Sequence, residues 1–143
     1  MNTKALIAIL IALPTLALAG FKIPSKVFEI AELDKAKAEA AQKGKPIAIL
    51  YSDKDTTCPL CVNASETIIR ELGGKTVMVY VRSAESLPPA AQAALQAGAY
   101  IPKVAVLNGA LDKSLGVVTY EAIKADPRKA FRDVEKAIRE YKK

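Results

Sequence analysis

The stretch Thr56-Thr57-Cys58-Pro59-Leu60-Cys61 contains both cysteines of the chain, two residues apart. It follows an apolar run and precedes a segment with helical periodicity, so we expect Cys58 at the first turn of a helix. At that position unpaired backbone N–H groups and the positive end of the helix dipole favour a thiolate over a thiol. Cys61, one turn later, lies within reach to close a disulfide with Cys58. The pair meets the minimum requirement for thiol–disulfide exchange, which is therefore the first hypothesis.

The composition limits the other chemistries that the chain can support. Its 143 residues suit one domain with a single hydrophobic core, and 51% of them are apolar. Histidine is absent, which excludes histidine-based triads, histidine general bases and nearly every transition-metal site. Two cysteines without histidine cannot form a four-ligand zinc site within one chain, although a site shared between two chains stays open. We therefore expect no metal and no cofactor.

The first residues have the pattern of an export signal. Lys4 is a short basic region, Ala5–Ala19 is an uncharged apolar run, and Ala17-Leu18-Ala19 matches the small-x-small cleavage pattern. We predict that residues 1–19 are a signal peptide cleaved after Ala19. The alternative is an uncleaved membrane anchor, because the uncharged stretch continues through Phe21. Either way the folded part is expected in the periplasm or outside the cell, where disulfides persist.

The net charge of +6 is concentrated near the C-terminus, where acidic residues are interleaved with the basic ones. A nucleic-acid interface would need a basic face with stacking aromatic side chains. The interleaved acids favour a solvated helix face instead, with no nucleic-acid partner; weak attraction to anionic membranes or acidic partners is the alternative. The basic residues are Lys124, Arg128, Lys129, Arg132, Lys136, Arg139, Lys142 and Lys143, and the acidic ones are Asp126, Asp133, Glu135 and Glu140.

Hydrophobic periodicity and turn signals predict alternating strands and helices in one domain, residues 27–143, after an irregular leader at 20–26. No repeat or second domain is evident. Strands are predicted at Val27–Ile30, Ile47–Tyr51, Lys75–Val81, Lys103–Leu107 and Leu115–Tyr120. Helices are predicted at Glu32–Lys43, from Pro59 until Gly73-Gly74, at Pro88–Ala97, and from the Asp126-Pro127 cap to Tyr141.

The predicted order is therefore β-α-β-α-β-α-β-β-α. Alternation through the first half predicts parallel crossovers, and the Asn108-Gly109 turn signal predicts an antiparallel pair near the end. A mixed central sheet covered by helices on both faces follows, which is an α/β fold.

This order, the CxxC at the start of the second helix, and Ile101-Pro102 before the next-to-last strand resemble the thioredoxin-like superfamily. The resemblance covers about Val27 to Tyr141. A CxxC alone can also bind metal or be structural. Its combination with an Ile-Pro 44 residues later (102 − 58) is more specific. The resemblance implies a three-layer α/β/α sandwich with a mixed central sheet.

The resemblance also implies the roles of the two cysteines. Cys58 would be the attacking, more exposed thiolate and Cys61 the resolving partner, and the two would form the Cys58–Cys61 disulfide. The implied activity is that of an extracytoplasmic thiol–disulfide oxidoreductase that exchanges disulfides with protein substrates and an unidentified redox partner. Whether it oxidises, reduces or isomerises stays open, as does its oligomeric state.

Four further residues are assigned to substrate binding by the same resemblance. Pro102 is expected to be cis and to lie against the cysteines; the alternative is that it merely begins an edge strand. Ile101 and Pro102 would present backbone to the substrate, with Thr57 and Leu60 as neighbours.

The sequence departs from the family pattern around the cysteines, where the loop Ser52–Thr57 is also longer than in thioredoxin. Cys-Pro-x-Cys is similar to glutaredoxins and periplasmic disulfide oxidases, but Leu60 replaces the histidine of the strong oxidants. Thr57 stands where thioredoxin has a tryptophan, and Leu50 where it has a buried acid. Asp53 and Asp55 lie nearby and are expected to be solvated. The missing tryptophan and acid motivate one alternative, a binding or scaffold protein with a structural disulfide. A second alternative is a dithiol that transfers metal or electrons.

Overall fold

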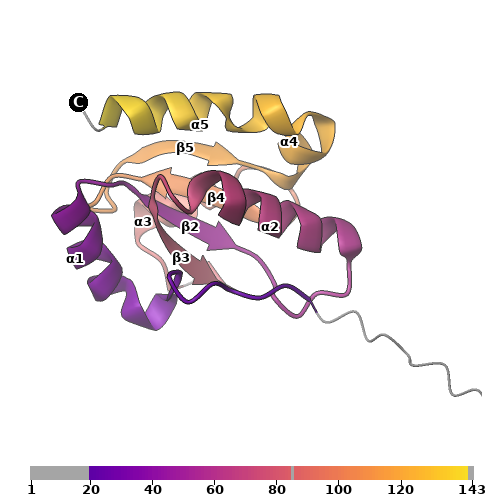
Figure 1. Ribbon diagram of the computed structural model, residues 1–143, viewed down its shortest axis with the longest axis horizontal. Coiled ribbons are helices and arrows are strands. Elements are labelled where there is room, and N and C mark those ends of the chain that lie inside the picture. The colour runs from indigo at the N-terminus through magenta and orange to yellow at the C-terminus, as the bar shows by residue number, and fades with distance from the viewer. Residues whose placement is uncertain (1–19, 85, 142–143) are drawn as a thin grey trace, which may run out of the picture.

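The computed structural model describes residues 20–84 and 86–141, which form a five-stranded sheet with helices on both faces (Figure 1). The predicted signal peptide lies outside the described residues. The strands are β1 Phe28–Glu29, β2 Ile47–Tyr51, β3 Val77–Val81, β4 Lys103–Leu107 and β5 Ser114–Val118. The helices are α1 Leu33–Lys43, α2 Pro59–Leu72, α3 Pro89–Leu95, α4 Tyr120–Ala125 and α5 Pro127–Tyr141, with a 3-10 helix at Ile30–Glu32.

The sheet is mixed, as predicted. Its strands lie in the order β1-β3-β2-β4-β5, with β1, β3 and β2 parallel to one another. Strand β4 is antiparallel to both β2 and β5. The chain differs from the predicted series of elements by the 3-10 helix after β1 and by two C-terminal helices in place of one.

The central strands are buried on both faces because successive side chains point to opposite sides of a sheet. Ala48 and Leu50 of β2 pack in the hydrophobic cluster that contains residues of α2, α4 and α5. Ile47 and Ile49 of the same strand pack in a second cluster with residues of α1 and α3. The arrangement is consistent with a three-layer sandwich, in which α2, α4 and α5 form one outer layer (Figure 1).

Local hydrogen bonds explain where the elements depart from the predicted bounds. Strand β3 begins at Val77 because Lys75 and Thr76 continue the turn that ends α2: both backbone N–H groups donate to the Leu72 carbonyl. Strand β5 ends at Val118 because the Thr119 hydroxyl accepts the Ala122 N–H at 3.2 Å and begins helix α4, which the sequence reading missed. In the described part of the chain, no helix has the length and apolar character needed to cross a membrane.

The leader at 20–26 has no helix or strand, as predicted, but it is not detached from the domain. Phe21 is only 6% exposed and joins the core on the α2 face of the sheet. Its N–H donates to the Lys54 carbonyl at 3.1 Å, in the loop that leads from β2 to the cysteines. The leader therefore packs beside the candidate site.

Candidate functional site

The first turn of α2 presents Cys58 as predicted. Cys58 is the N-cap residue, with extended backbone (φ −79°, ψ 109°), and Pro59 occupies the first turn, where a missing N–H costs no hydrogen bond. The Cys61 N–H donates to Cys58 Sγ at 3.2 Å, and the Cys58 N–H donates to Thr56 Oγ1 at 3.3 Å. The first turn contains no acidic residue. The sulfur of Cys58 therefore lies in the electropositive environment of a helix N-terminus.

Cys58 and Cys61 are joined by a disulfide. Their Cα atoms lie 5.2 Å apart, and both residues are half-buried. Leu60, between them, is 59% exposed, although it is a large apolar side chain. The pair thus lies at the surface and carries an apolar residue that faces solvent.

The sheet brings Ile101 and Pro102 to the same end as the cysteine loop. Tyr51, the last residue of β2, pairs with Lys103, the first residue of the antiparallel strand β4. The segments beyond these two residues, which lead to Cys58 and to Pro102, therefore lie at one end of the sheet. The Ile101–Pro102 peptide bond is cis, with Pro102 buried and Ile101 half-buried.

The loop before Pro102 is held by Lys103, a strand residue that is only 6% exposed. Its ammonium donates to the carbonyls of Ala97 at 3.1 Å and Gly98 at 3.0 Å. Charged donors form stronger hydrogen bonds than neutral ones, so two bonds from one buried cation fix this turn firmly. The turn continues from the C-terminus of α3, whose last carbonyls lack helical partners.

The same loop is held from its other side by Glu121 of α4. Glu121 Oε1 accepts the N–H groups of Ala99 at 2.7 Å and Tyr100 at 3.2 Å. The N–H groups of its own backbone and of Ala99 hold the pKa of the Glu121 carboxyl below its usual range, against the opposing effect of burial. Gly98 has φ +72°, and a Cβ there would lie 2.7 Å from Glu121 Oε2, so the close approach requires glycine.

Leu50 and a pair of buried hydroxyl groups lie in the segments next to the cysteines. Leu50 is fully buried, as its apolar character requires. Two residues later, Ser52 forms a buried hydrogen bond of 2.8 Å with Ser65, which lies one helical turn after Cys61. The sequence reading missed this pair, because the hydroxyls belong to different elements; the signal was Ser65 four residues after Cys61.

The two acids of the cysteine loop lie at the surface, as predicted, but they are paired. Asp53 and Asp55 contact Arg82, which follows β3, at 2.9 Å and 3.0 Å. The Lys54 N–H in the same loop donates to the Tyr80 hydroxyl at 2.9 Å. Burial raises the pKa of Tyr80, so this hydroxyl stays protonated at neutral pH.

Two tyrosines lie in contact near the Ile101-Pro102 segment. Thr57 is exposed, and so is Tyr100, at 63%, directly before Ile101. The Tyr100 ring meets the edge of Tyr120 with centroids 6.3 Å apart. Tyr120 in turn lines a groove with Leu60. The side chains of Leu60, Tyr120 and Tyr100 therefore form a surface that extends from the cysteine motif to the loop before Pro102. The sequence reading missed both tyrosines, although Tyr100 stands next to the Ile-Pro motif.

No protein-family model and no curated protein sequence matches this chain. The α/β fold with its mixed sheet and the disulfide-bonded Cys58–Cys61 pair is compatible with a thioredoxin-like fold. Any functional conclusion therefore depends on the site itself.

Proposed function

We propose that this protein is a thioredoxin-like thiol–disulfide oxidoreductase that exchanges disulfides with protein substrates outside the cytoplasm. One observation carries the proposal: Cys58 caps the N-terminus of α2, and its sulfur accepts the Cys61 N–H. After reduction, the same N–H and the helix dipole stabilise a thiolate at Cys58, which is the nucleophile in disulfide exchange. A disulfide that only cross-links the chain needs no such environment.

The exchange has two steps. In the reducing direction, the Cys58 thiolate attacks one sulfur of a substrate disulfide; the substrate S–S bond breaks, a mixed disulfide forms, and the other substrate sulfur leaves as a thiolate. Cys61 then loses its proton and attacks Cys58 Sγ. The Cys58–Cys61 disulfide forms and the second substrate thiolate is released. In the oxidising direction a substrate dithiol reverses both steps, and a redox partner restores the starting state.

The substrate would bind over the surface that joins the two halves of the site. Ile101 and Pro102 present backbone at the end of the sheet, and Thr57 and Leu60 flank the cysteines. Tyr100 adds the exposed aromatic surface that Thr57 lacks. The fixed position of the proline loop supports this role, since a substrate strand needs a rigid edge to contact.

The proposed location follows from the export pattern in residues 1–19. An exported oxidoreductase would act where protein disulfides form and persist. Mass measurement of the N-terminus of the protein purified from its native host tests cleavage after Ala19.

Two cysteine variants test the activity. Cys58→Ser should abolish exchange with a protein disulfide, whereas Cys61→Ser should accumulate mixed disulfides because the resolving step is lost. Both are measured by thiol labelling and mass spectrometry. Equal activity of Cys58→Ser and the unaltered protein would refute the proposal. Titration of the pair against glutathione then gives the direction of electron flow.

A structural disulfide in a binding protein is the second candidate. Leu50, Ser52 and Ser65 favour this candidate, because these buried side chains have no carboxylate that could take the proton from Cys61. This candidate predicts a very negative reduction potential and slow alkylation of both thiols after reduction. Rapid alkylation of Cys58 alone would exclude it.

A further inference from the structure

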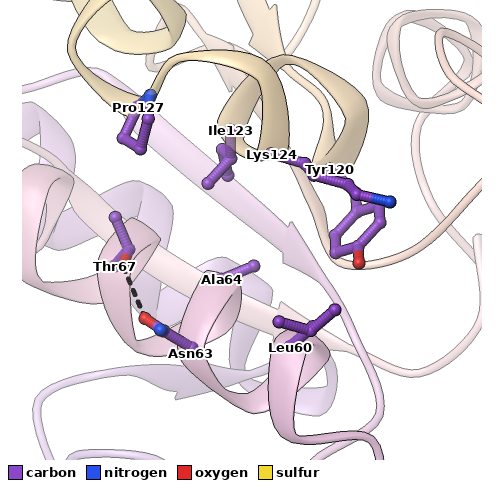
Figure 2. Close-up of a pocket in the computed structure, with 8 residues that line it drawn as sticks. All are labelled: Leu60, Asn63, Ala64, Thr67, Tyr120, Ile123, Lys124 and Pro127. Carbon is purple, nitrogen blue, oxygen red and sulfur yellow. Dashed lines mark hydrogen bonds between the residues drawn. The ribbon is translucent and has the colours of Figure 1, made fainter.

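A groove begins at the cysteine motif and runs between α2 and α4. Figure 2 shows Leu60, Asn63, Ala64 and Thr67 on one wall and Tyr120, Ile123, Lys124 and Pro127 on the other. Its volume is about 210 Å³. Leu60 directly precedes Cys61, so a ligand in this groove lies next to the disulfide. The floor is apolar, with Ala64 and Ile123 both buried.

The groove continues along α2 toward its C-terminal end. A second section of about 370 Å³ is lined by Arg70 and Glu71 of α2 and by Arg128, Phe131 and Glu135 of α5. Pro127 lines both sections and so joins them. The result is one surface channel with an apolar end at the cysteines and a charged end.

The charges of this channel do not cancel. Glu71 pairs with Arg70 at 3.4 Å, and Glu135 pairs with Lys75. The exposed side chains of Lys124 and Arg128 have no acidic partner within 20–84 and 86–141. The paired groups are neutral together, so these two cations give the channel a net positive charge. A ligand with an apolar part and a carboxylate would complement it.

The polar groups of the first section suit a peptide backbone. The Thr67 hydroxyl donates to Asn63 Oδ1 at 3.4 Å, which orients the Asn63 amide (Figure 2). Asn63 Nδ2 has no hydrogen-bond partner among the described residues and is exposed. It is therefore free to donate to a carbonyl of an extended segment lying in the groove.

We propose that this groove binds an extended segment of the protein that exchanges disulfides with Cys58, which rests on the proposed function. The segment carries an apolar side chain beside its cysteine, over Leu60, and an acidic side chain near Arg128. Arg70 lines the second section of the channel together with Arg128, so its position on α2 gives the length of the channel. Leu60 and Arg70 are separated by ten residues of helix (70 − 60), or about 15 Å. An extended chain covers that distance in about four or five residues, which sets the spacing between the two side chains.

The test uses the oxidised full chain and a short synthetic peptide without cysteine. The peptide has serine in place of the reacting cysteine and leucine next to this serine. A glutamate follows five residues after the leucine. NMR titration should move the amide signals of Asn63, Thr67 and Lys124. Replacing the peptide glutamate by lysine, or using Lys124→Glu with Arg128→Glu, should weaken binding about tenfold, as expected for two exposed charge contacts.

Lys35→Glu with Lys37→Glu is the matched control, because this double substitution makes the same charge change at exposed positions of α1, on the opposite face of the sheet. Its affinity for the peptide should equal that of the unaltered protein. The groove proposal would be refuted if the peptide shifted amide signals outside the groove. It would also be refuted if neither the reversal in the peptide nor that in the protein changed the affinity. Dilution of the protein without peptide gives a further check. If dilution shifted the amide signals of the groove residues, a second copy of the chain would be the occupant, and the proposal would be refuted.

A second measurement separates this inference from the activity. With exchange intact, the double charge reversal should raise KM for a disulfide of the acidic peptide and leave exchange with the uncharged hydroxyethyl disulfide unchanged. Equal effects on both substrates would overturn the groove. Peptide binding in the groove without exchange toward any disulfide would refute the proposed function while supporting the groove as a docking surface.

Discussion

The two loops that meet at the end of the sheet are held in place by different chemistry. The cysteine loop, residues 52–57, is tied at its tip by Arg82, whose side chain is 54% exposed. The proline loop, residues 97–102, is tied by Lys103, which is 6% exposed, and by Glu121. Exposed ion pairs contribute little to stability, whereas a buried cation bonded to backbone is costly to remove.

The difference indicates a division of tasks between the loops. Under the proposed function, the proline loop would be the fixed surface against which a substrate is positioned. The cysteine loop is held at its base by the buried Ser52–Ser65 hydrogen bond. In its middle, the Lys54 backbone bonds to the Tyr80 hydroxyl and to the Phe21 N–H. Its acidic side chains, Asp53 and Asp55, form ion pairs with the exposed Arg82. The proposed exchange would require the Cys58 sulfur to reach a substrate, and a loop whose outer contacts are exposed ion pairs would allow a small adjustment.

Lys103→Met should have the largest effect on the proline loop. The substitution keeps the chain length and removes the ammonium, so the Ala97 and Gly98 carbonyls lose their donor. We expect a loss of about 1.5–3 kcal/mol in the free energy of unfolding, measured by urea denaturation. Lys113→Met, at an exposed position before β5, is the control and should change little. Equal effects of the two substitutions would remove the contrast between the loops.

Ser65→Ala should destabilise the base of the cysteine loop by about 1–2 kcal/mol, because it leaves the buried Ser52 hydroxyl without its partner. The double substitution Ser52→Ala with Ser65→Ala should cost less than the sum of the single ones, since both polar groups are removed together. A double-mutant cycle in urea measures this coupling. Strictly additive effects would show that the two hydroxyls do not stabilise each other.

Glu121→Gln should loosen the proline loop without unfolding the domain, because a neutral amide oxygen accepts weaker hydrogen bonds than a carboxylate. Hydrogen exchange at Ala99 and Tyr100 should become several-fold faster. The folded pKa of Glu121 is lowered from 4.5, so its contribution is present above that pH and lost as the pH falls through the folded value.

The pH dependence of Glu121 is isolated by subtraction. The pKa of Glu32 is also lowered, first by its side-chain hydrogen bond to Lys35, so the stabilisation from Glu32 is also lost at acidic pH. The difference in stability between the unaltered protein and Glu121→Gln should therefore shrink as the pH falls below about 4.5. If this difference in stability stayed constant as the pH fell, the ionised Glu121 carboxylate would not be the source of the stabilisation.

Arg82→Ala should have the smallest effect, about 0.2–1 kcal/mol, because its ion pairs with Asp53 and Asp55 are exposed. Screening should reduce even this loss at about 1 M salt. Urea denaturation at low and high salt measures it. A cost as large as that of Lys103→Met would mean that the two loops are equally fixed.

Much of the fold was predictable because it depends on local pattern. The apolar runs at Ile47–Tyr51 and Lys103–Leu107 are strands with the predicted bounds. Pro59 marks the start of α2, and Asp126 caps α5 through Oδ1, which accepts the N–H of Arg128 at 3.0 Å. Periodicity, proline and capping side chains act over a few residues, so the sequence displays them directly.

The remaining features depend on contacts between distant segments. Lys103 looked like the polar first residue of a strand, and nothing local shows that its ammonium turns back to the carbonyls of Ala97 and Gly98. The contact between Tyr100 and Tyr120 and the Ser52–Ser65 bond likewise join separate elements. Helix α4 was missed because its six residues give too short a periodic signal.

The packing of Phe21 determines how the molecule would be oriented on a surface. Phe21 is fixed in the core and bonded to Lys54, so any preceding residues leave the domain beside the cysteine loop. If residues 1–19 were retained as an anchor, the cysteine pair would lie on the membrane side of the domain, and the proposed exchange would take place with partners held in the bilayer plane. Cleavage after Ala19 would release the same site to diffuse toward soluble substrates. The processing of a single peptide bond would thus select the population of partners.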